Sequence, residues 1–174
     1  MKILVTGPES AGKSTLARGL AWVLDGIYVE EQARSYLHAR GGHYTAEDLP
    51  RILAQQLSAE RQAVALNSSF VLCDTGAEVI RVWSEVKYGG CDPFVLNAFH
   101  DSSYDLTLLC APDIPWAHDQ LRESRSREER EALFHRYRSI LPNAIIIDEK
   151  HRLERALSIV IDYSRRSGAP DGIT

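Results

Sequence analysis

Short apolar runs alternate with longer amphipathic stretches along this chain of 174 residues. The apolar runs are rich in Ile, Val and Leu and are bounded by polar residues or glycine, as strands buried in a parallel sheet are. They cover residues 3–5, 27–29, 70–73, 106–110 and 144–147. Strands that alternate with helices in this way predict an α/β fold, with a five-stranded, mostly parallel sheet flanked by helices.

The stretches between the runs carry the apolar periodicity of helices. The expected helices span about 13–24, 47–66, 77–87, 121–139 and 151–166. A further short helix over 92–101 is left open. A chain of this length forms one core, so we expect a single domain over residues 1–167. Residues 168–174 combine glycine, proline and small side chains, which predicts a frayed tail.

The composition and net charge indicate which class of partner the protein binds. A hydrophobic fraction of 44% and a charged fraction of 25% are ordinary for a globular protein, and no apolar run has the length of a membrane span. The net charge of −4 argues against a nucleic-acid partner, because proteins that bind nucleic acid present a concentrated basic face. Only three apolar residues follow Lys2, far fewer than a secretion signal needs, so we expect a cytoplasmic protein. We predict a small-molecule partner and no membrane, and leave a homo-oligomer open.

The sequence GPESAGKST, residues 7–15, fits the Walker A pattern and lies between a predicted strand and a predicted helix, as that pattern requires. Gly7 and Gly12 allow backbone conformations that turn successive N–H groups towards phosphates at the positive end of the helix. Lys13 then neutralises the outer phosphates, and Ser14 supplies an oxygen to Mg²⁺. We therefore predict ATP and Mg²⁺ as ligands. The predicted ATP contacts in this loop are Gly7, Glu9, Ser10, Ala11, Gly12, Lys13, Ser14 and Thr15.

A second part of such a site follows the strand at 70–73, where Asp74 stands at the carboxyl end of an apolar run. A Walker B segment delivers an aspartate to magnesium in the same way. An aspartate here would also suit the cap of the next helix. Beside a Walker A loop, we predict that Asp74 joins Ser14 at Mg²⁺ or acts in catalysis.

The segment after the second strand carries Glu30, Glu31 and Arg34 at the sheet edge where open α/β folds bind ligands. No asparagine–lysine pair follows the strand at 106–110, which disfavours a guanine switch. At this edge a carboxylate can take the proton of an acceptor hydroxyl, and an arginine can hold developing charge. The alternative is a solvated helix start, which favours acids through its dipole. We predict substrate contacts from all three residues and favour Glu31 over Glu30.

An arginine-rich stretch, residues 121–130, follows the fourth strand, where nucleoside and nucleotide kinases carry a lid. Lid arginines close over phosphates, so we predict that Arg122 acts in catalysis and that Arg125 contacts ATP. Interleaved Arg and Glu on a solvated helix face are the alternative. Just before this stretch, Trp116 either packs in the core or stacks on a flat ligand.

Five stretches of the chain together carry a resemblance that covers most of residues 1–150. They read GPESAGKSTLARGLA, EQARSYL, DLPRILAQQ, CDTGAEVIRVWSEVKYG and YDLTLLCAPDIPWAHDQLR. This set resembles the ribosylnicotinamide kinase family of NadR-like proteins, most specifically in E-x-A-R after the second strand and D-I-P-W before the lid. The resemblance implies a P-loop NTPase fold of the nucleoside-kinase type with a helical lid. It also implies transfer of the γ-phosphate of ATP to the 5′-hydroxyl of nicotinamide riboside, giving nicotinamide mononucleotide in NAD salvage.

The match also implies roles for single residues. Glu31 and Arg34 would lie near the riboside, Asp74 near magnesium and the acceptor hydroxyl, and Arg122 in the lid. Whether Glu31 or Asp74 is the base stays open.

The sequence departs from the family in three places. None of the six histidines has the H-x-G-H spacing of the adenylyltransferase domain that full NadR proteins carry. Gly76 follows Thr75 where the family commonly has aspartate, and residues 118–120 read HDQ in place of DDG. These departures leave the acceptor open. The alternatives are a kinase for another nucleoside and a nucleotide-dependent regulatory module with slow ATP hydrolysis.

Overall fold

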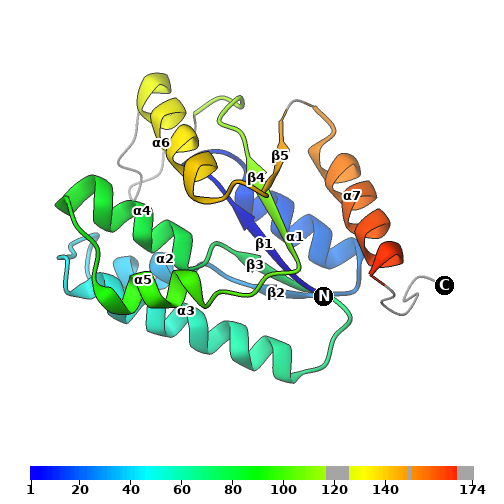
Figure 1. The fold of residues 1–174 in the computed structure, drawn as a ribbon, viewed down its shortest axis with the longest axis horizontal. Helices are drawn as coiled ribbons and strands as arrows, with labels where there is room; N and C mark the ends of the chain where they lie inside the picture. Colours follow the sequence, from blue (N-terminus) through cyan, green and yellow to red (C-terminus); the bar gives the residue numbers. More distant parts are fainter. Residues whose placement is uncertain (117–125, 149, 168–174) are drawn as a thin grey trace.

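A computed structural model of the chain describes residues 1–116, 126–148 and 150–167. The described residues form a five-stranded sheet in the order β2-β3-β1-β4-β5, with helices on both faces (Figure 1). All the strand pairs are parallel. The strands are β1 (Lys2–Thr6), β2 (Ile27–Val29), β3 (Val71–Asp74), β4 (Leu106–Cys110) and β5 (Ile145–Ile147). The α/β fold and its parallel sheet are confirmed, and each strand lies within one residue of the predicted run.

The helices alternate with the strands along the chain. They are α1 (Lys13–Val23), α2 (Gln32–Ala39), α3 (Asp48–Ala65), α4 (Ala77–Tyr88), α5 (Pro93–His100), α6 (Arg127–Ile140) and α7 (Arg152–Arg166). The short helix left open near 92–101 is present, and Asp92 caps it by accepting from the Phe94 N–H at 2.7 Å. The eight-residue helix α2 was not predicted. The part of the predicted lid helix at 121–125 and the predicted tail at 168–174 lie outside the described residues.

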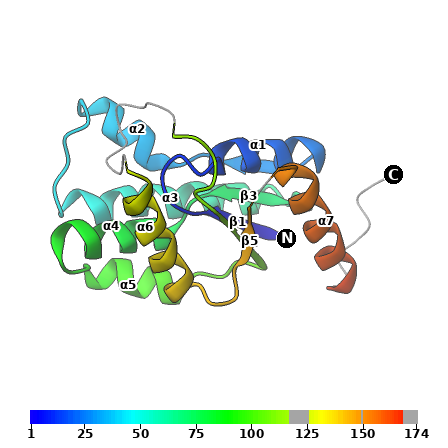
Figure 2. The ribbon, with the colours of Figure 1, turned by 90° about the horizontal axis from the view of Figure 1, so that it is seen from above.

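Alternate residues of the strands pack on opposite faces of the sheet, as the two-residue period of a strand requires. Ile3 and Val5 of β1 join the core beneath α1 and α7, while Leu4 joins the core on the opposite face, against α3. Helices α4 and α6 extend that second layer, with α5 packed outside α4 (Figure 2). Because the sheet is covered on both faces, ligands can reach it only at its ends and edges.

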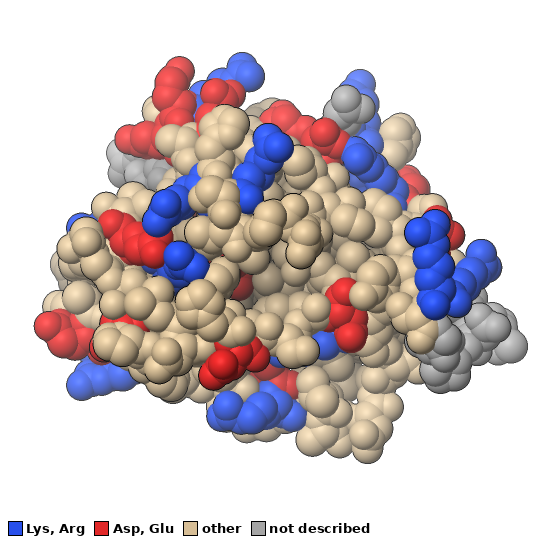
Figure 3. Space-filling view, in the orientation of Figure 1, with Lys and Arg blue, Asp and Glu red and all other residues tan. Residues whose placement is uncertain are grey.

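Surface charge is mixed on the face shown in Figure 3, where acidic and basic side chains are interspersed. Among the described residues, no helix combines the length and the apolar character needed to cross a membrane.

Candidate active site

The loop between β1 and α1 has the backbone shape that the Walker A pattern predicts. Gly7 has φ +139°, Gly12 has φ +78°, and Ser10 between them has φ +54°. A Cβ on Gly7 would lie 2.5 Å from the carbonyl oxygen of Cys110, so β4 approaches the loop too closely for any side chain there. Gly12 is the N-cap of α1, which begins at Lys13. The loop therefore curls around the amino end of α1, where N–H groups bind anions.

Two basic side chains donate hydrogen bonds to carbonyls of this loop, one from within the motif and one from α7. The Lys13 ammonium donates to the Pro8 carbonyl at 2.9 Å, across the concave side of the loop. The Arg152 guanidinium, from α7, donates to the carbonyls of Ala11 at 2.8 Å and Ala111 at 3.0 Å, and it also pairs with Asp113. Arg152 thus ties the loop to the end of β4. Sequence reasoning missed this residue, because it lies about 140 positions from the loop that it supports.

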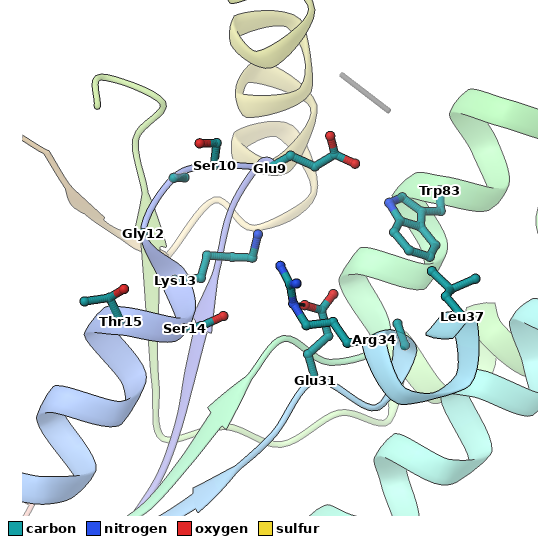
Figure 4. Close-up of a pocket in the computed structure, with 12 residues that line it drawn as sticks. Glu9, Ser10, Gly12, Lys13, Ser14, Thr15, Glu31, Arg34, Leu37 and Trp83 are labelled. Atoms are coloured by element: carbon teal, nitrogen blue, oxygen red, sulfur yellow. Dashed lines mark hydrogen bonds and ion pairs between the residues drawn. The ribbon is translucent and has the colours of Figure 1, made fainter. Parts of the chain in front are cut away.

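The loop forms one wall of a pocket, and α2 with α4 forms the other (Figure 4). The described residues that line it are Glu9, Ser10, Ala11, Gly12, Lys13, Ser14, Thr15, Glu31, Ala33, Arg34, Leu37 and Trp83. In Figure 4 the Lys13 ammonium and the Glu31–Arg34 pair point towards the same space. The structure therefore brings the predicted phosphate side and the predicted acceptor side together.

Glu31 is the acidic group on the side of the pocket where the sequence predicts the acceptor. It is the N-cap of α2, only 9% exposed, and it accepts from Arg34 Nε at 3.2 Å. Burial raises the pKa of Glu31 above its usual range, and the positive charge of Lys13 opposes that shift. Burial therefore favours the protonated form of this carboxyl more than it would in an exposed glutamate.

Asp74 is the last residue of β3, almost fully buried, and is not among the described residues that line the pocket. Tyr28 donates its hydroxyl to Asp74 Oδ2 at 2.8 Å, whereas Oδ1 has no hydrogen-bond partner among the described residues. A buried carboxylate oxygen without a donor is the kind of ligand that Mg²⁺ takes. The same described residues hold no group of three or more His, Cys, Asp or Glu side chains that could bind a metal. The predicted roles of Asp74 and Ser14 at Mg²⁺ stay predictions.

The turn after Asp74 is held by buried polar groups. Thr75 has φ +70°, and Gly76 donates its N–H to Glu78 at 3.0 Å. Gln56, from α3, donates to the Thr75 carbonyl at 3.2 Å and accepts from the Gln32 N–H at 3.0 Å. Gln56 therefore links the turn that carries Asp74 to the turn that carries Glu31.

Other predicted residues lie outside this pocket. Glu30 is exposed and pairs with Arg18 at 3.4 Å, away from Glu31. Trp116 is half-buried in the segment that meets the phosphate loop through the Ser10 hydroxyl and the Pro115 carbonyl, 3.5 Å apart, and it does not line the pocket. Arg122 and Arg125 lie outside the described residues, and their lid roles stay predictions.

The aromatic residue on the pocket wall is Trp83, which sequence reasoning missed. Its ring stacks on Tyr44, with centroids 5.6 Å apart and planes inclined by 25°. Trp83 stands in the second turn of α4, whereas most of the pocket is lined by residues of the phosphate loop, α1 and α2.

Comparisons with known proteins place this site in context. The profile of a family described as an AAA domain matches residues 2–154. The trifunctional NAD biosynthesis/regulator protein NadR of Salmonella typhimurium strain LT2 is 28% identical over 134 residues, which are 75% of this chain and 33% of that protein. NadR of Escherichia coli strain K12 is 27% identical over 132 residues, 74% of this chain and 32% of that protein. The chain thus spans about a third of these relatives.

Solved structures show the same resemblance. A crystal structure of a NadR protein in complex with NR has a TM-score of 0.72 and 26% identity, covering 94% of this chain and 51% of that one. A NadR structure with NAD and AMP-PNP has a TM-score of 0.76, also at 26% identity, and covers 49% of that chain. Deoxyadenosine kinase from M. mycoides with bound dATP, at 14% identity and a TM-score of 0.59, shares the fold alone. The predicted P-loop fold of the nucleoside-kinase type is confirmed, and the chain is NadR-like.

Proposed function

We propose that this chain, which belongs to the AAA domain family and is NadR-like in sequence and fold, is an ATP-dependent nucleoside kinase. As acceptor we propose nicotinamide riboside, phosphorylated on its 5′-hydroxyl to give nicotinamide mononucleotide. The observation that carries the proposal is a single pocket that opens on Lys13 from one side and on the Glu31–Arg34 pair from the other.

On the nucleotide side, the backbone of the phosphate loop and the Lys13 ammonium hold the β- and γ-phosphates. Ser14 and Asp74 would hold Mg²⁺, which when bound neutralises charge on the phosphate oxygens. Arg152 keeps the loop against the end of β4, so the N–H groups do not have to be ordered when ATP arrives. These residues orient the γ-phosphoryl group towards the acceptor side.

On the acceptor side, Glu31 takes the proton of the attacking hydroxyl. Because its pKa is raised, Glu31 is a stronger base than an exposed glutamate. Arg34 fixes the carboxylate through its 3.2 Å hydrogen bond, and Glu31 rather than the deeper Asp74 faces the pocket. This geometry supports Glu31 as the base and leaves Asp74 to the metal.

The substrate class follows from the wall opposite the loop. Trp83 offers an aromatic ring edge or face to a flat group, and aromatic rings attract cations. A nicotinamide riboside carries a positively charged ring, which suits both Trp83 and the nearby Glu31 carboxylate. A neutral nucleoside would use only the apolar part of this wall.

The test is ATP consumption and product formation with a panel of ribosides, for the wild type, Glu31→Gln and Glu30→Gln. We expect nicotinamide riboside to stimulate turnover and Glu31→Gln to lower transfer at least about tenfold, with ATP affinity unchanged. Glu30→Gln is the matched control, because its carboxylate is the exposed neighbour on the same turn.

Three results would count against the proposal. Stimulation that survives in Glu31→Gln would remove Glu31 from the reaction. An equal loss of phosphate transfer in Glu31→Gln and Glu30→Gln would show that the negative charge near this turn matters, and that the buried position of Glu31 does not. ATP hydrolysis that no riboside stimulates would favour a nucleotide-dependent regulatory module instead.

A further inference from the structure

Tyr28 makes a hydrogen bond that nothing in the sequence pattern predicted. It lies in β2, half-buried, and its hydroxyl reaches across to β3, where it donates to Asp74 Oδ2 at 2.8 Å. A phenol hydroxyl carries the only proton that this pair can share at physiological pH, so Tyr28 is the donor and the carboxylate is the acceptor.

This bond divides the two oxygens of Asp74 into separate roles. Oδ2 accepts from Tyr28, while Oδ1 is buried and has no partner among the described residues. Rotation of the carboxylate would break the bond to Tyr28, so the bond fixes the orientation in which Oδ1 stays available. Asp74 pairs in register with Val5, two residues before the phosphate loop begins at Gly7, which puts it beside that loop.

Tyr28 is itself held from two directions. Its backbone pairs with Leu72 in the parallel ladder between β2 and β3. The Arg18 guanidinium lies over its ring, 5.1 Å from the centroid. Arg18 belongs to α1, the helix that begins at Lys13, so the ring is packed between the element that carries Asp74 and the element that carries the loop lysine.

We propose that Tyr28 is a positioning residue that holds the Asp74 carboxylate so that Oδ1 stays available to the Mg²⁺ that Mg-ATP would bring. The inference rests on the proposed function for its kinetic consequence, but its effect on metal-dependent nucleotide binding does not require an acceptor. Tyr28 does not touch the reacting atoms. It acts through Asp74, by removing the need to orient that carboxylate when the metal and nucleotide arrive.

The test is the isosteric change Tyr28→Phe, which keeps the packed ring and deletes only the hydroxyl. Calorimetric titration with AMP-PNP, in Mg²⁺ and in EDTA, measures how far the metal tightens nucleotide binding. We expect Tyr28→Phe to reduce that metal-dependent gain about tenfold and to leave the affinity in EDTA within about twofold of wild type. In steady-state assays, kcat should fall by a similar factor while KM for the riboside stays the same.

Tyr36→Phe provides the matched control. Tyr36 also donates its hydroxyl to a buried aspartate, Asp48, at 2.6 Å, but that pair lies outside the pocket. We expect Mg²⁺ to tighten AMP-PNP binding by Tyr36→Phe as much as it tightens binding by the wild type. An equal loss in the two variants would overturn the proposal, because any buried tyrosine–aspartate bond would then have the same effect.

A double-mutant cycle with Asp74→Asn decides whether Tyr28 acts through Asp74. In the Asp74→Asn background, Tyr28→Phe should cause no further loss of the metal-dependent gain. Losses that multiply would overturn the inference, as would a Tyr28→Phe protein with an unchanged gain or with weakened binding in EDTA. Because these titrations contain no riboside, a failure of the kinase proposal leaves their outcome interpretable.

Discussion

Replacing Glu78 by glutamine should remove a pH dependence from the stability of the protein. Glu78 is 1% exposed on α4, where it accepts from the Gly76 N–H at 3.0 Å in the turn after Asp74. Burial raises the pKa of Glu78 from an ordinary 4.5 to about 7. Glutamine keeps an oxygen that can accept from Gly76 but has no charge to bury, so the variant isolates the cost of ionisation.

The sign follows from which state binds the proton more tightly. The folded protein holds the Glu78 proton up to about pH 7, whereas the unfolded chain releases it near pH 4.5. Between these values the folded state binds more protons, so the free energy of unfolding falls as the pH rises and levels off above about pH 7. At about 1.4 kcal/mol for each pH unit, this group destabilises the ionised folded protein by roughly 3 kcal/mol.

The assay is urea denaturation of the wild type, Glu78→Gln and Glu128→Gln between pH 5 and 8. Glu128 is an exposed glutamate of α6, so its variant should follow the pH dependence of the wild type. We expect the stability advantage of Glu78→Gln over wild type to grow by roughly 3 kcal/mol across this range. If the two curves stay parallel, Glu78 is ionised in the folded protein throughout, and the reasoning from burial is wrong.

Two further predictions concern the phosphate loop. Lys13→Ala should abolish phosphate transfer without unfolding the protein, because it deletes the positive charge at the outer phosphates. Product assays measure the transfer, and circular dichroism checks the fold. Near-normal turnover would contradict the Walker A assignment. Gly7→Ala should destabilise the protein by roughly 2 kcal/mol or more and weaken ATP binding, since its Cβ would lie 2.5 Å from the Cys110 carbonyl oxygen at a φ of +139°. Thermal unfolding measures the change, with Gly90→Ala, whose Cβ would meet nothing within 4 Å, as the control that should unfold like the wild type.

The sheet and the phosphate loop could be predicted because both are local in sequence. Each strand is a continuous apolar run, and the loop is a continuous motif of nine residues whose glycines take the expected positive φ values. Helix α2 escaped prediction for a related reason. It is only eight residues long, and just Ala33 and Leu37 are buried in it, so its apolar face is too short to show a period.

The acceptor side could be predicted only in part. In the sequence, Glu30 and Glu31 are neighbours with the same chemistry. In the structure, Glu31 is the N-cap of α2 and is buried, whereas Glu30 pairs with Arg18 on the surface. Trp83 and Tyr28 were missed because no local motif marks them. Trp83 reaches the pocket from α4, and Tyr28 reaches Asp74 from β2 across to β3, so each contact joins elements that are distant in sequence.

The strand order gives the two halves of the pocket unequal support. The phosphate loop follows β1, which is paired on both sides, by β3 and by β4. Glu31 and Arg34 follow β2, an edge strand whose only ladder in the described sheet joins the three residues Ile27–Val29 to β3. Substitutions after β2 therefore disturb few backbone pairings, whereas substitutions after β1 act on the centre of the sheet. Under the proposed function, a lineage with this architecture could exchange one acceptor for another at the edge while it inherits its way of holding ATP unchanged.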